Sequence, residues 1–255
     1  MVNLKSAAWD SIGDLFWEKG RKSARPSEYE LEVFINNIEP GQRVCVIGAS
    51  TKELVESLVN IGAQVTVYDF SRGMCESLRA AISNPNVVIK QLDICSPLDY
   101  KLNGSQDFVL NDRLINRFNA HEALNALHNM NLLTGGIGEV RASIKLGFYP
   151  MDLRMIKLGR ERGTLNDFFN QDNRTIDFSA AGNILEEALV KHGDINAEIL
   201  LDWYRGRASE KRFEHDDVID MVSQVTLPNG EQLKVEKVEA FPDAISTNLY
   251  YIRAK

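Results

Sequence analysis

The chain has 255 residues, with 29 Lys and Arg against 36 Asp and Glu, and a formal net charge of -7. Apolar residues make up 44% and charged residues 25%, a balance typical of soluble globular proteins. No run approaches the roughly 18 apolar residues of a membrane-spanning helix. An acidic chain also lacks the basic face that nucleic-acid phosphates require. We therefore expect neither a membrane nor a nucleic acid as partner.

The cysteines bear on the compartment. Cys45, Cys75 and Cys95 are odd in number and well separated, and two of them sit inside apolar runs. Such thiols are typical of a reducing compartment rather than of a disulfide framework. Residues 1–6 also lack the long apolar stretch of a secretory signal. These features predict a cytoplasmic protein.

Residues 1–38 predict two helices. The first carries an apolar face made of Trp9, Ile12, Phe16 and Trp17. Pro26 opens the second, near the helix start where its missing N–H costs nothing, and the Pro40-Gly41 turn follows that helix. The aromatic face could form a lid that excludes water, although aromatic residues at helical spacing more often simply pack.

From residue 42 to about residue 146, short apolar runs alternate with helical patterns. The predicted strands cover residues 43–47, 64–68, 87–92, 107–110 and 140–144. The predicted helices cover residues 51–61, 72–83 and 119–133. Strands that alternate with helices of this length imply right-handed crossovers and a parallel sheet.

The rhythm changes after the fifth strand. Residues 148–221 are mostly helical in pattern, most clearly over 151–163 and 180–191, and residues 232–241 and 247–253 predict two final strands. We therefore predict one α/β domain over residues 1–255. Its mostly parallel sheet has seven strands and ends in an antiparallel pair, with helical residues 1–38 in front and a helical substrate insert over 148–221.

The first strand runs through Gly48, Ala49 and Ser50 straight into a helix. Small residues there let a ligand approach the backbone, and the free N–H groups of the helix start point at it. The same residues would also suit close packing of helix on sheet, so this turn alone leaves both interpretations open.

Acidic residues end the next two strands. Asp69 lies 21 residues after Gly48, a spacing that suits a ribose diol. Asp93 ends the third strand, where it could accept a hydrogen bond from an adenine amino group while Ile94 packs on the adenine ring. Each acid alone could instead cap a helix. Together with the glycine turn at one sheet edge, they favour a nucleotide site.

With the fourth-strand end 110–113 and the terminal β pair, these residues resemble the class I S-adenosylmethionine-dependent methyltransferases over most of the chain. The resemblance implies a Rossmann-like fold and S-adenosylmethionine as cosubstrate, and the spacing of the four histidines predicts no metal. It implies cofactor contacts from Gly48, Ala49, Ser50, Asp69, Phe70, Ser71, Asp93, Ile94 and Asn111.

The first turn departs from the family pattern, which is an acid, any residue, and then alternating glycines. Val46 stands at the position of the acid, and Ser50 and Lys52 stand at the second and third glycine positions. The acid normally helps to hold the methionine amino group of the cofactor. Ser50, Thr51, Arg113 or Arg117 are candidates to hold that end instead.

Three functions remain open. We favour methylation of a small molecule, with Asn111, Asp112 and Tyr149 as candidate catalytic residues, although Asp112 could merely pair with an arginine. The valine at position 46 also fits 3-amino-3-carboxypropyl transfer, or cyclisation to azetidine-2-carboxylate with release of methylthioadenosine. The last alternative is a non-catalytic nucleotide-binding module.

The acceptor is expected to contact the fourth-strand end and the insert. Candidate substrate-binding residues are Arg113, Arg117, Tyr204 and Arg205. Aromatic and cationic residues over 203–207 suit an anionic or planar group, although the bases of 203–217 are matched by acids and could form a solvated face. The histidines show no metal-ligand spacing. The sequence makes no prediction of oligomeric state.

Overall fold

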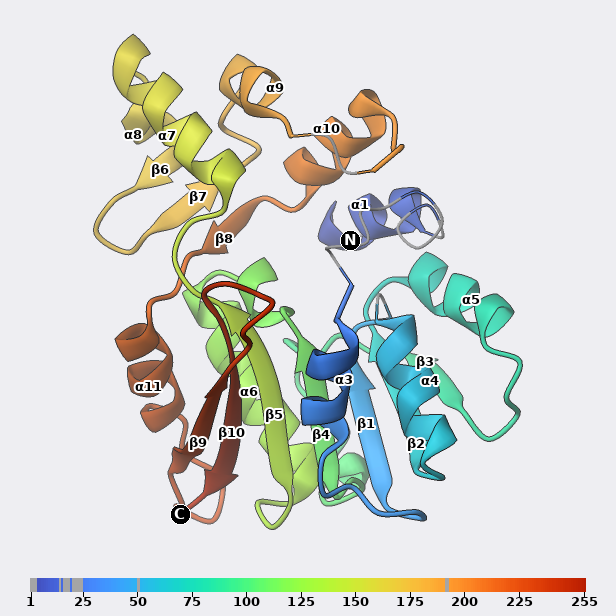
Figure 1. The fold of residues 1–255 in the computed structure, drawn as a ribbon. Coiled ribbons are helices and arrows are strands. Elements are labelled where there is room, and N and C mark those ends of the chain that lie inside the picture. The colour runs from blue at the N-terminus through green and yellow to red at the C-terminus, as the bar shows by residue number, and fades with distance from the viewer. Residues whose placement is uncertain (1–3, 14, 16–18, 20–24, 50, 191–192) are drawn as a thin grey trace.

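The computed structural model describes residues 4–13, 15, 19, 25–49, 51–190 and 193–255, and Phe16, Trp17 and Ser50 lie outside these ranges. One sheet of seven strands has the order β3-β2-β1-β4-β5-β10-β9 and is covered by helices on both faces (Figure 1). The predicted Rossmann-like architecture is confirmed.

Five strands form the parallel part of this sheet. They are β1 (Arg43–Ile47), β2 (Gln64–Asp69), β3 (Val88–Gln91), β4 (Phe108–Asp112) and β5 (Glu139–Lys145). Each lies within two residues of its predicted range at either end. Residues 44–47 of β1 are all buried, as a central strand with helices on both faces requires.

Helices α4 (Lys52–Asn60), α5 (Arg72–Ala81) and α6 (Ala120–Thr134) connect the parallel strands. Local sequence sets their ends. The Ser71 hydroxyl caps α5, Asn119 and Glu122 form a capping box on α6, and Gly135 ends α6 with a φ of 64°. The loops after β1, β2 and β4 therefore all open at the carboxyl edge of the sheet.

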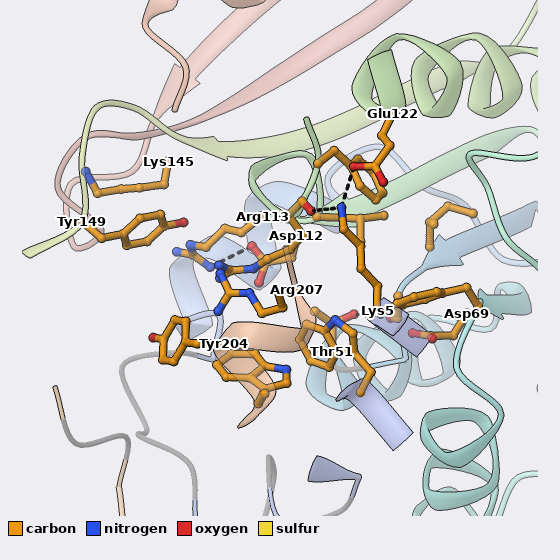
Figure 2. Close-up of a pocket in the computed structure, with 18 of the residues that line it drawn as sticks. Lys5, Thr51, Asp69, Asp112, Arg113, Glu122, Lys145, Tyr149, Tyr204 and Arg207 are labelled. Carbon is orange, nitrogen blue, oxygen red and sulfur yellow. Dashed lines mark hydrogen bonds and ion pairs between the residues drawn. The ribbon is translucent and has the colours of Figure 1, made fainter. Parts of the chain in front are cut away.

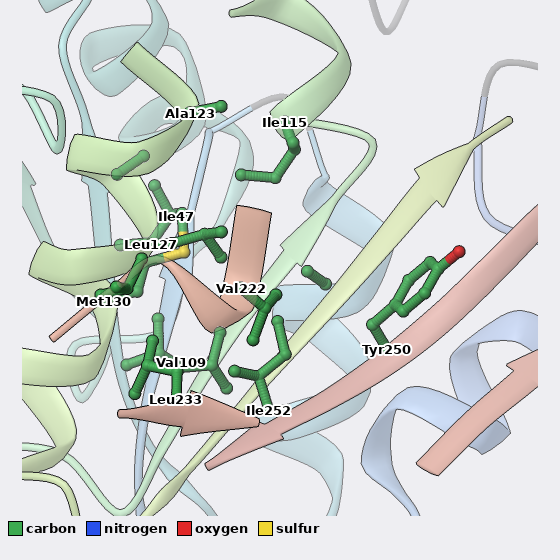
Figure 3. Close-up of a cluster of buried hydrophobic side chains, with 14 of the residues drawn as sticks. Ile47, Val109, Ile115, Ala123, Leu127, Met130, Val222, Leu233, Tyr250 and Ile252 are labelled. Carbon is green, nitrogen blue, oxygen red and sulfur yellow. The ribbon is translucent and has the colours of Figure 1, made fainter. Parts of the chain in front are cut away.

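The apolar core lies on both faces of the sheet. Cys45 and Ile47 of β1 pack with α6 on one face, and Val44 and Val46 pack on the other. Figure 3 shows the first cluster, in which Ile47, Val109 and Leu127 meet between the sheet and α6. This alternation follows from the two-residue period of a strand.

The last two strands are β9 (Leu233–Ala240) and β10 (Thr247–Ala254). Strand β10 pairs antiparallel with both β5 and β9, which confirms the predicted terminal pair. Helix α11 (His215–Ser223) contacts β9 and α6, so it belongs to the sheet layer rather than to the insert.

Between β5 and α11 the chain forms an insert above the carboxyl edge of the sheet (Figure 1). Its helices are α7 (Pro150–Arg162), α8 (Leu165–Phe168), α9 (Asn183–Ala188) and α10 (Ala197–Gly206). A small antiparallel sheet of β6 (Phe169–Asn170), β7 (Thr175–Asp177) and β8 (Ser209–Lys211) accompanies them. The sequence did not predict these strands, because two or three residues are too few to show a periodic pattern.

The N-terminal helices α1 (Leu4–Ile12) and α3 (Glu28–Ile35) confirm the predicted pair where they are described. Helix α1 contacts both α5 and α10, and thus joins the sheet layer to the insert (Figure 1). The Trp9 and Trp203 rings meet edge to face, with their centroids 5.1 Å apart. No helix among the described residues is long and apolar enough to span a bilayer.

Candidate functional site

A cavity of about 420 Å³ lies between the carboxyl edge of the sheet and the insert. Its walls come from α1, from the loops after β1 to β5, and from the insert. In Figure 2, Thr51 and Asp69 lie at one end of the cavity, Lys145 and Tyr149 at the other, and Asp112 and Arg113 between them. A volume of this size is typical of a small-molecule site.

The first turn lets the cavity reach the backbone. Gly48 has a φ of 103°, and its N–H donates to the Tyr68 carbonyl at 2.8 Å. A Cβ placed on Gly48 meets no atom within 4 Å, so the space above its Cα is open. Ala49 is buried, and the Thr51 hydroxyl donates to the Gly48 carbonyl at 3.1 Å. This glycine conformation therefore forms a cradle at the cavity wall.

Substitution of Gly48 by Ala tests this cradle. The positive φ is expected to cost about 1–3 kcal/mol of unfolding free energy, and the added methyl group should weaken S-adenosylhomocysteine binding in calorimetry. Gly41→Ala is the matched control, because Gly41 has a φ of 85° and open space but lies outside the cavity. Equal losses of ligand affinity in both variants would contradict the assignment.

Asp69 ends β2 at the cavity wall with both carboxylate oxygens engaged. Oδ2 accepts from the Ala49 N–H and Oδ1 from the Ser71 N–H, each at 2.7 Å. Burial raises the Asp69 pKa to about 6, because its effect is larger than the lowering of the pKa by these two hydrogen bonds. The nearby Asp10 carboxylate raises the pKa further. The carboxylate thus joins the first two turns and remains at the cavity surface.

The loop after β3 supplies a second acid. Asp93 lines the cavity and orders its own turn, because it accepts from the Cys95 N–H at 2.9 Å and from the Ser96 hydroxyl at 3.0 Å. Ile94 and Phe70 line the cavity beside it. The structure therefore brings together most of the residues predicted to bind the cofactor.

Three predicted cofactor contacts at these turns are exceptions, namely Ala49, Ser71 and Ser50, and Ala49 is buried and does not line the cavity. Ser71 is fully buried and does not line the cavity, and its hydroxyl donates to Asp10 at 2.5 Å while capping α5. Its N–H reaches the site only through Asp69. The predicted cofactor contact of Ser50 lies outside the described residues.

The end of β4 carries a buried charge cluster. Asp112 Oδ1 accepts from the Arg113 guanidinium at 2.7 Å and from the Ser143 hydroxyl at 2.5 Å. The same guanidinium donates to Glu30 of α3, whose pKa is raised mainly by burial. Arg113 itself has a φ of 51°. Asp112 and Arg113 both line the cavity, and the ion pair that the sequence left open for Asp112 is present.

Asn111 does not line the cavity. It is fully buried, and its Nδ2 lies 3.4 Å from the Met130 sulfur on α6. Because side chains alternate along a strand, Asn111 and Asp112 point to opposite faces of the sheet. The sequence named both residues at the fourth-strand end, and the fold brings only the second to the cavity.

The insert end of the cavity holds a buried ion-pair network. Arg212 pairs with Asp152 at 2.6 Å and with Glu210 at 3.0 Å, and Arg207 pairs with Glu210 at 2.6 Å. Burial would raise the Glu210 pKa, but the surrounding arginines lower it to about 2. The Arg207 guanidinium also lies 4.4 Å from the ring centroid of Trp203. The network fixes the insert side of the wall.

Three predicted substrate-binding residues, Arg113, Arg117 and Tyr204, line the cavity, as does Tyr149. Arg205 does not; it points to the surface and pairs with Glu186 at 2.6 Å. Arg207 of the predicted aromatic and cationic segment 203–207 also lines the cavity, whereas the charged lining residues Lys5, Glu122, Lys145, Asp152 and Arg212 were not predicted as site residues. Lys5 pairs with Glu122 at 2.6 Å across the cavity (Figure 2). No motif or spacing marks these residues, and Arg212 lies in the charge-rich run 205–217.

Three solved structures place the chain among known proteins. A Rhodobacter sphaeroides protein, provisionally named a Zn-dependent alcohol dehydrogenase, has 45% identity over 100% of both chains and a TM-score of 0.96. The CcbJ methyltransferase from Streptomyces caelestis has 12% identity over 98% of both chains and a TM-score of 0.63. The Burkholderia thailandensis 1,6-didemethyltoxoflavin-N1-methyltransferase, solved with S-adenosylhomocysteine, has 10% identity over 99% of this chain and 87% of that chain, with a TM-score of 0.55.

No protein-family model and no curated protein matches the chain. The two distant similarities show the fold, and the first similarity shows common descent over the whole length. The chain therefore belongs to one family with the Rhodobacter sphaeroides protein, and its fold is that of the class I S-adenosylmethionine-dependent methyltransferases.

Proposed function

We propose that the protein is an S-adenosylmethionine-dependent transferase that acts on a small molecule. One observation carries the proposal. A single cavity runs from the Gly48 and Asp69 turns to a chamber under the insert, which we call the charged chamber and which is lined by Arg117, Lys145, Arg207 and Arg212. Such a cavity offers room for an adenosyl group at one end and an acceptor at the other. The Burkholderia thailandensis enzyme, which shares the fold and was solved with S-adenosylhomocysteine, supports the same cosubstrate.

The residues at the sheet edge fit this cosubstrate. Asp69 would accept from the ribose diol, Asp93 would take the adenine amino group, and Ile94 would pack on the ring. The open cradle at Gly48 would let the methionine chain pass close to the backbone. Arg113 lies beyond that cradle in the middle of the cavity, where it would hold the methionine end by its carboxylate rather than by the amino group.

The sulfonium supplies an electrophilic carbon, and the acceptor supplies the electron pair. In the favoured reaction a bond forms from the acceptor to the methyl carbon, the S–CH3 electron pair stays on sulfur, and the acceptor proton leaves to water or a nearby base. The protein mainly has to align the two, since orientation alone can remove about 7–11 kcal/mol of the barrier. Tyr149 is the proposed group nearest the acceptor, because it lines the charged chamber.

Product analysis tests the reaction type. The protein is incubated with S-adenosylmethionine, first alone and then with a panel of candidate acceptors, and the products are identified by mass spectrometry. S-adenosylhomocysteine that forms only with an acceptor supports methylation. Methylthioadenosine formed without any acceptor would replace methylation by cyclisation. Neither product, together with tight cosubstrate binding, would identify a binding module.

The provisional name of the Rhodobacter relative implies a zinc ion, and the donor set here does not fit one. A catalytic zinc needs three protein ligands from His, Cys or carboxylates. Among the described residues no group of three or more such side chains could hold a metal ion. Burial also raises the pKa of the Cys45 and Cys75 thiols, which opposes the thiolate form that zinc requires.

We also propose that the protein works in the cytoplasm as one domain with an insert. The cysteines support the location, since Cys45, Cys75 and Cys95 are all free and two of them are buried. The network from Asp152 to Arg212 supports the single unit, because it ties the first helix of the insert to the chain that returns to the sheet.

A further inference from the structure

The chamber under the insert carries excess positive charge. Four cationic side chains line it, and only two carboxylates pair with them there, Asp152 and Glu210. The four cations are Arg117, Lys145, Arg207 and Arg212. Two acids near the start of helix α11 have ion-pair partners of their own, since Glu214 pairs with Arg174 and Asp217 with Lys211, although Glu214 also attracts the Lys145 ammonium. Four cations therefore share two carboxylates, which leaves a formal excess of two positive charges in the described part of the chamber.

Only some of these cations have donors to spare. Arg212 uses all three of its nitrogens on Asp152, Glu210 and the Asn116 carbonyl. Arg117 differs, because its guanidinium donates no hydrogen bond within the described residues and lies 3.7 Å from Glu210. Its side chain is 25% exposed, whereas that of Arg212 is 1% exposed. Arg212 is thus part of the scaffold, and Arg117 is a free donor at the cavity wall.

Tyr149 adds a polar group with no partner. Its hydroxyl is fully buried and makes no hydrogen bond with the described residues. The Arg117 guanidinium lies 5.6 Å from the ring centroid and the Lys145 ammonium lies 6.0 Å from it. Lys145 donates to one carbonyl, that of Leu146, and burial lowers its pKa. A buried hydroxyl without an acceptor is costly, and these two cations lie beside the ring that carries it.

We propose that Arg117, Lys145 and Tyr149 bind a carboxylate of the acceptor, and that the acceptor is a small aromatic carboxylic acid. The anion would satisfy the donors of all three side chains at once. Its ring would lie against the aromatic wall of the chamber, to which Phe118, Phe178 and Tyr204 contribute. This inference rests on the proposed function, since it names the substrate class of the same cavity.

A carboxylate could come from the cosubstrate as well as from the acceptor. Its position favours the acceptor. Tyr149 and Lys145 lie at the far end of the cavity from Asp69 and Thr51, with Arg113 between them (Figure 2). The methionine end of a cosubstrate that is held at Asp69 therefore meets Arg113 first.

The test uses the full chain saturated with S-adenosylhomocysteine and two probes, 4-hydroxybenzoate and its neutral isostere 4-hydroxybenzamide. Calorimetry is expected to show that the carboxylate binds at least about tenfold more tightly than the amide. The free energy of one hydrogen bond to a charged group corresponds to a change in affinity of at least that size. Arg117→Met should bring the ratio of the two affinities close to one. Tyr149→Phe should weaken the carboxylate severalfold and leave the amide unchanged.

Arg160→Met is the control, because Arg160 is an exposed arginine of the same insert that does not line the cavity. It should leave all affinities unchanged. The affinity of Arg117→Met for S-adenosylhomocysteine should stay within twofold of the wild type, which also shows that the variant is folded. A loss there without loss of the benzoate would assign the carboxylate to the cosubstrate and overturn the inference.

Equal binding of the two probes, or no binding of either, would overturn the inference while the proposed function stands. Failure of the wild type to bind S-adenosylhomocysteine at all would overturn the proposed function itself, and the inference with it.

Discussion

Asp69→Asn is expected to weaken binding of S-adenosylhomocysteine by on the order of 10- to 100-fold, since a charged hydrogen bond contributes about 1.5–3 kcal/mol. The substitution removes the charge that would accept from the ribose diol. The substitution also weakens the link between the Ala49 and Ser71 turns. Each carboxylate oxygen of Asp69 accepts one of the two N–H groups, whereas an amide has only one oxygen that can accept. Calorimetry at pH 7.5 measures the loss.

A second readout separates the diol contact from that local ordering. The wild type should prefer adenosine over 2′,3′-dideoxyadenosine, and Asp69→Asn should lose this preference. A variant that binds both nucleosides more weakly but keeps the preference would show that Asp69 only orders the two turns.

The pKa of Asp69 predicts how this binding depends on pH. Burial raises it to about 6, so the carboxyl group is mostly protonated at pH 5 and ionised at pH 7.5. Because the diol needs the ionised form, affinity should fall as the pH is lowered through 6 and should level off above 7. Binding at pH 6 should release protons, which calorimetry in buffers of different ionisation enthalpy detects. The Asp69→Asn profile should be flat over this range.

The same pKa has the opposite sign for the stability of the ligand-free protein. A carboxyl group whose folded pKa lies above its ordinary value of 3.8 favours the folded state while it is protonated. Its contribution is complete below about pH 4 and is lost as the pH rises through 6. Ligand binding should therefore stabilise the protein more at pH 7.5 than at pH 5, which thermal unfolding with and without S-adenosylhomocysteine can check.

Arg212→Met is expected to lower the free energy of unfolding by about 3–5 kcal/mol, because it leaves a buried carboxylate without its partner. Arg212 and Asp152 are each 1% exposed, and the Arg212 guanidinium bonds both oxygens of Asp152, at 2.6 and 3.2 Å. Glu210 keeps Arg207 as a partner, so the uncompensated charge is that of Asp152. Urea denaturation followed by circular dichroism measures the loss.

Two further variants test this explanation. Arg162→Met breaks an exposed pair with Glu187, whose side chains are 42% and 47% exposed, and should cost no more than about 1 kcal/mol. The double variant Arg212→Met with Asp152→Leu should recover part of the loss, because no unpaired charge then remains. If Arg212→Met unfolds no more easily than Arg162→Met, the network does not support the insert.

The fold was predictable where periodic patterns were long. The strands around Cys45 and Val109 and the helix from Ala120 were placed within two residues, because buried runs and capping residues are encoded locally. The sheet of β6, β7 and β8 was missed, since strands of two or three residues are formed by pairing between distant segments. Pairing of Thr175 with Lys211 has no local signature.

The candidate site divides in the same way. Asp69 and Asp93 were found because spacing from a glycine turn places acids at one sheet edge. Asn111 is buried against α6, whereas Asp112 lines the cavity. This difference follows from the orientation of β4 in the folded sheet, which spacing alone does not predict. Lys5 and Arg207 lie far in sequence from the strands that form the site. They reach the cavity only because α1 and α10 pack over it.

Period, spacing and turn chemistry within short segments were enough to specify the sheet, its terminal antiparallel pair and the acids at its carboxyl edge. Which charges meet under the insert depends on contacts between distant segments. Arg212 and Asp152 are 60 residues apart, and their pairing depends on how the insert folds back on itself. A buried ion pair requires geometry on the scale of one hydrogen bond, which composition and spacing cannot specify.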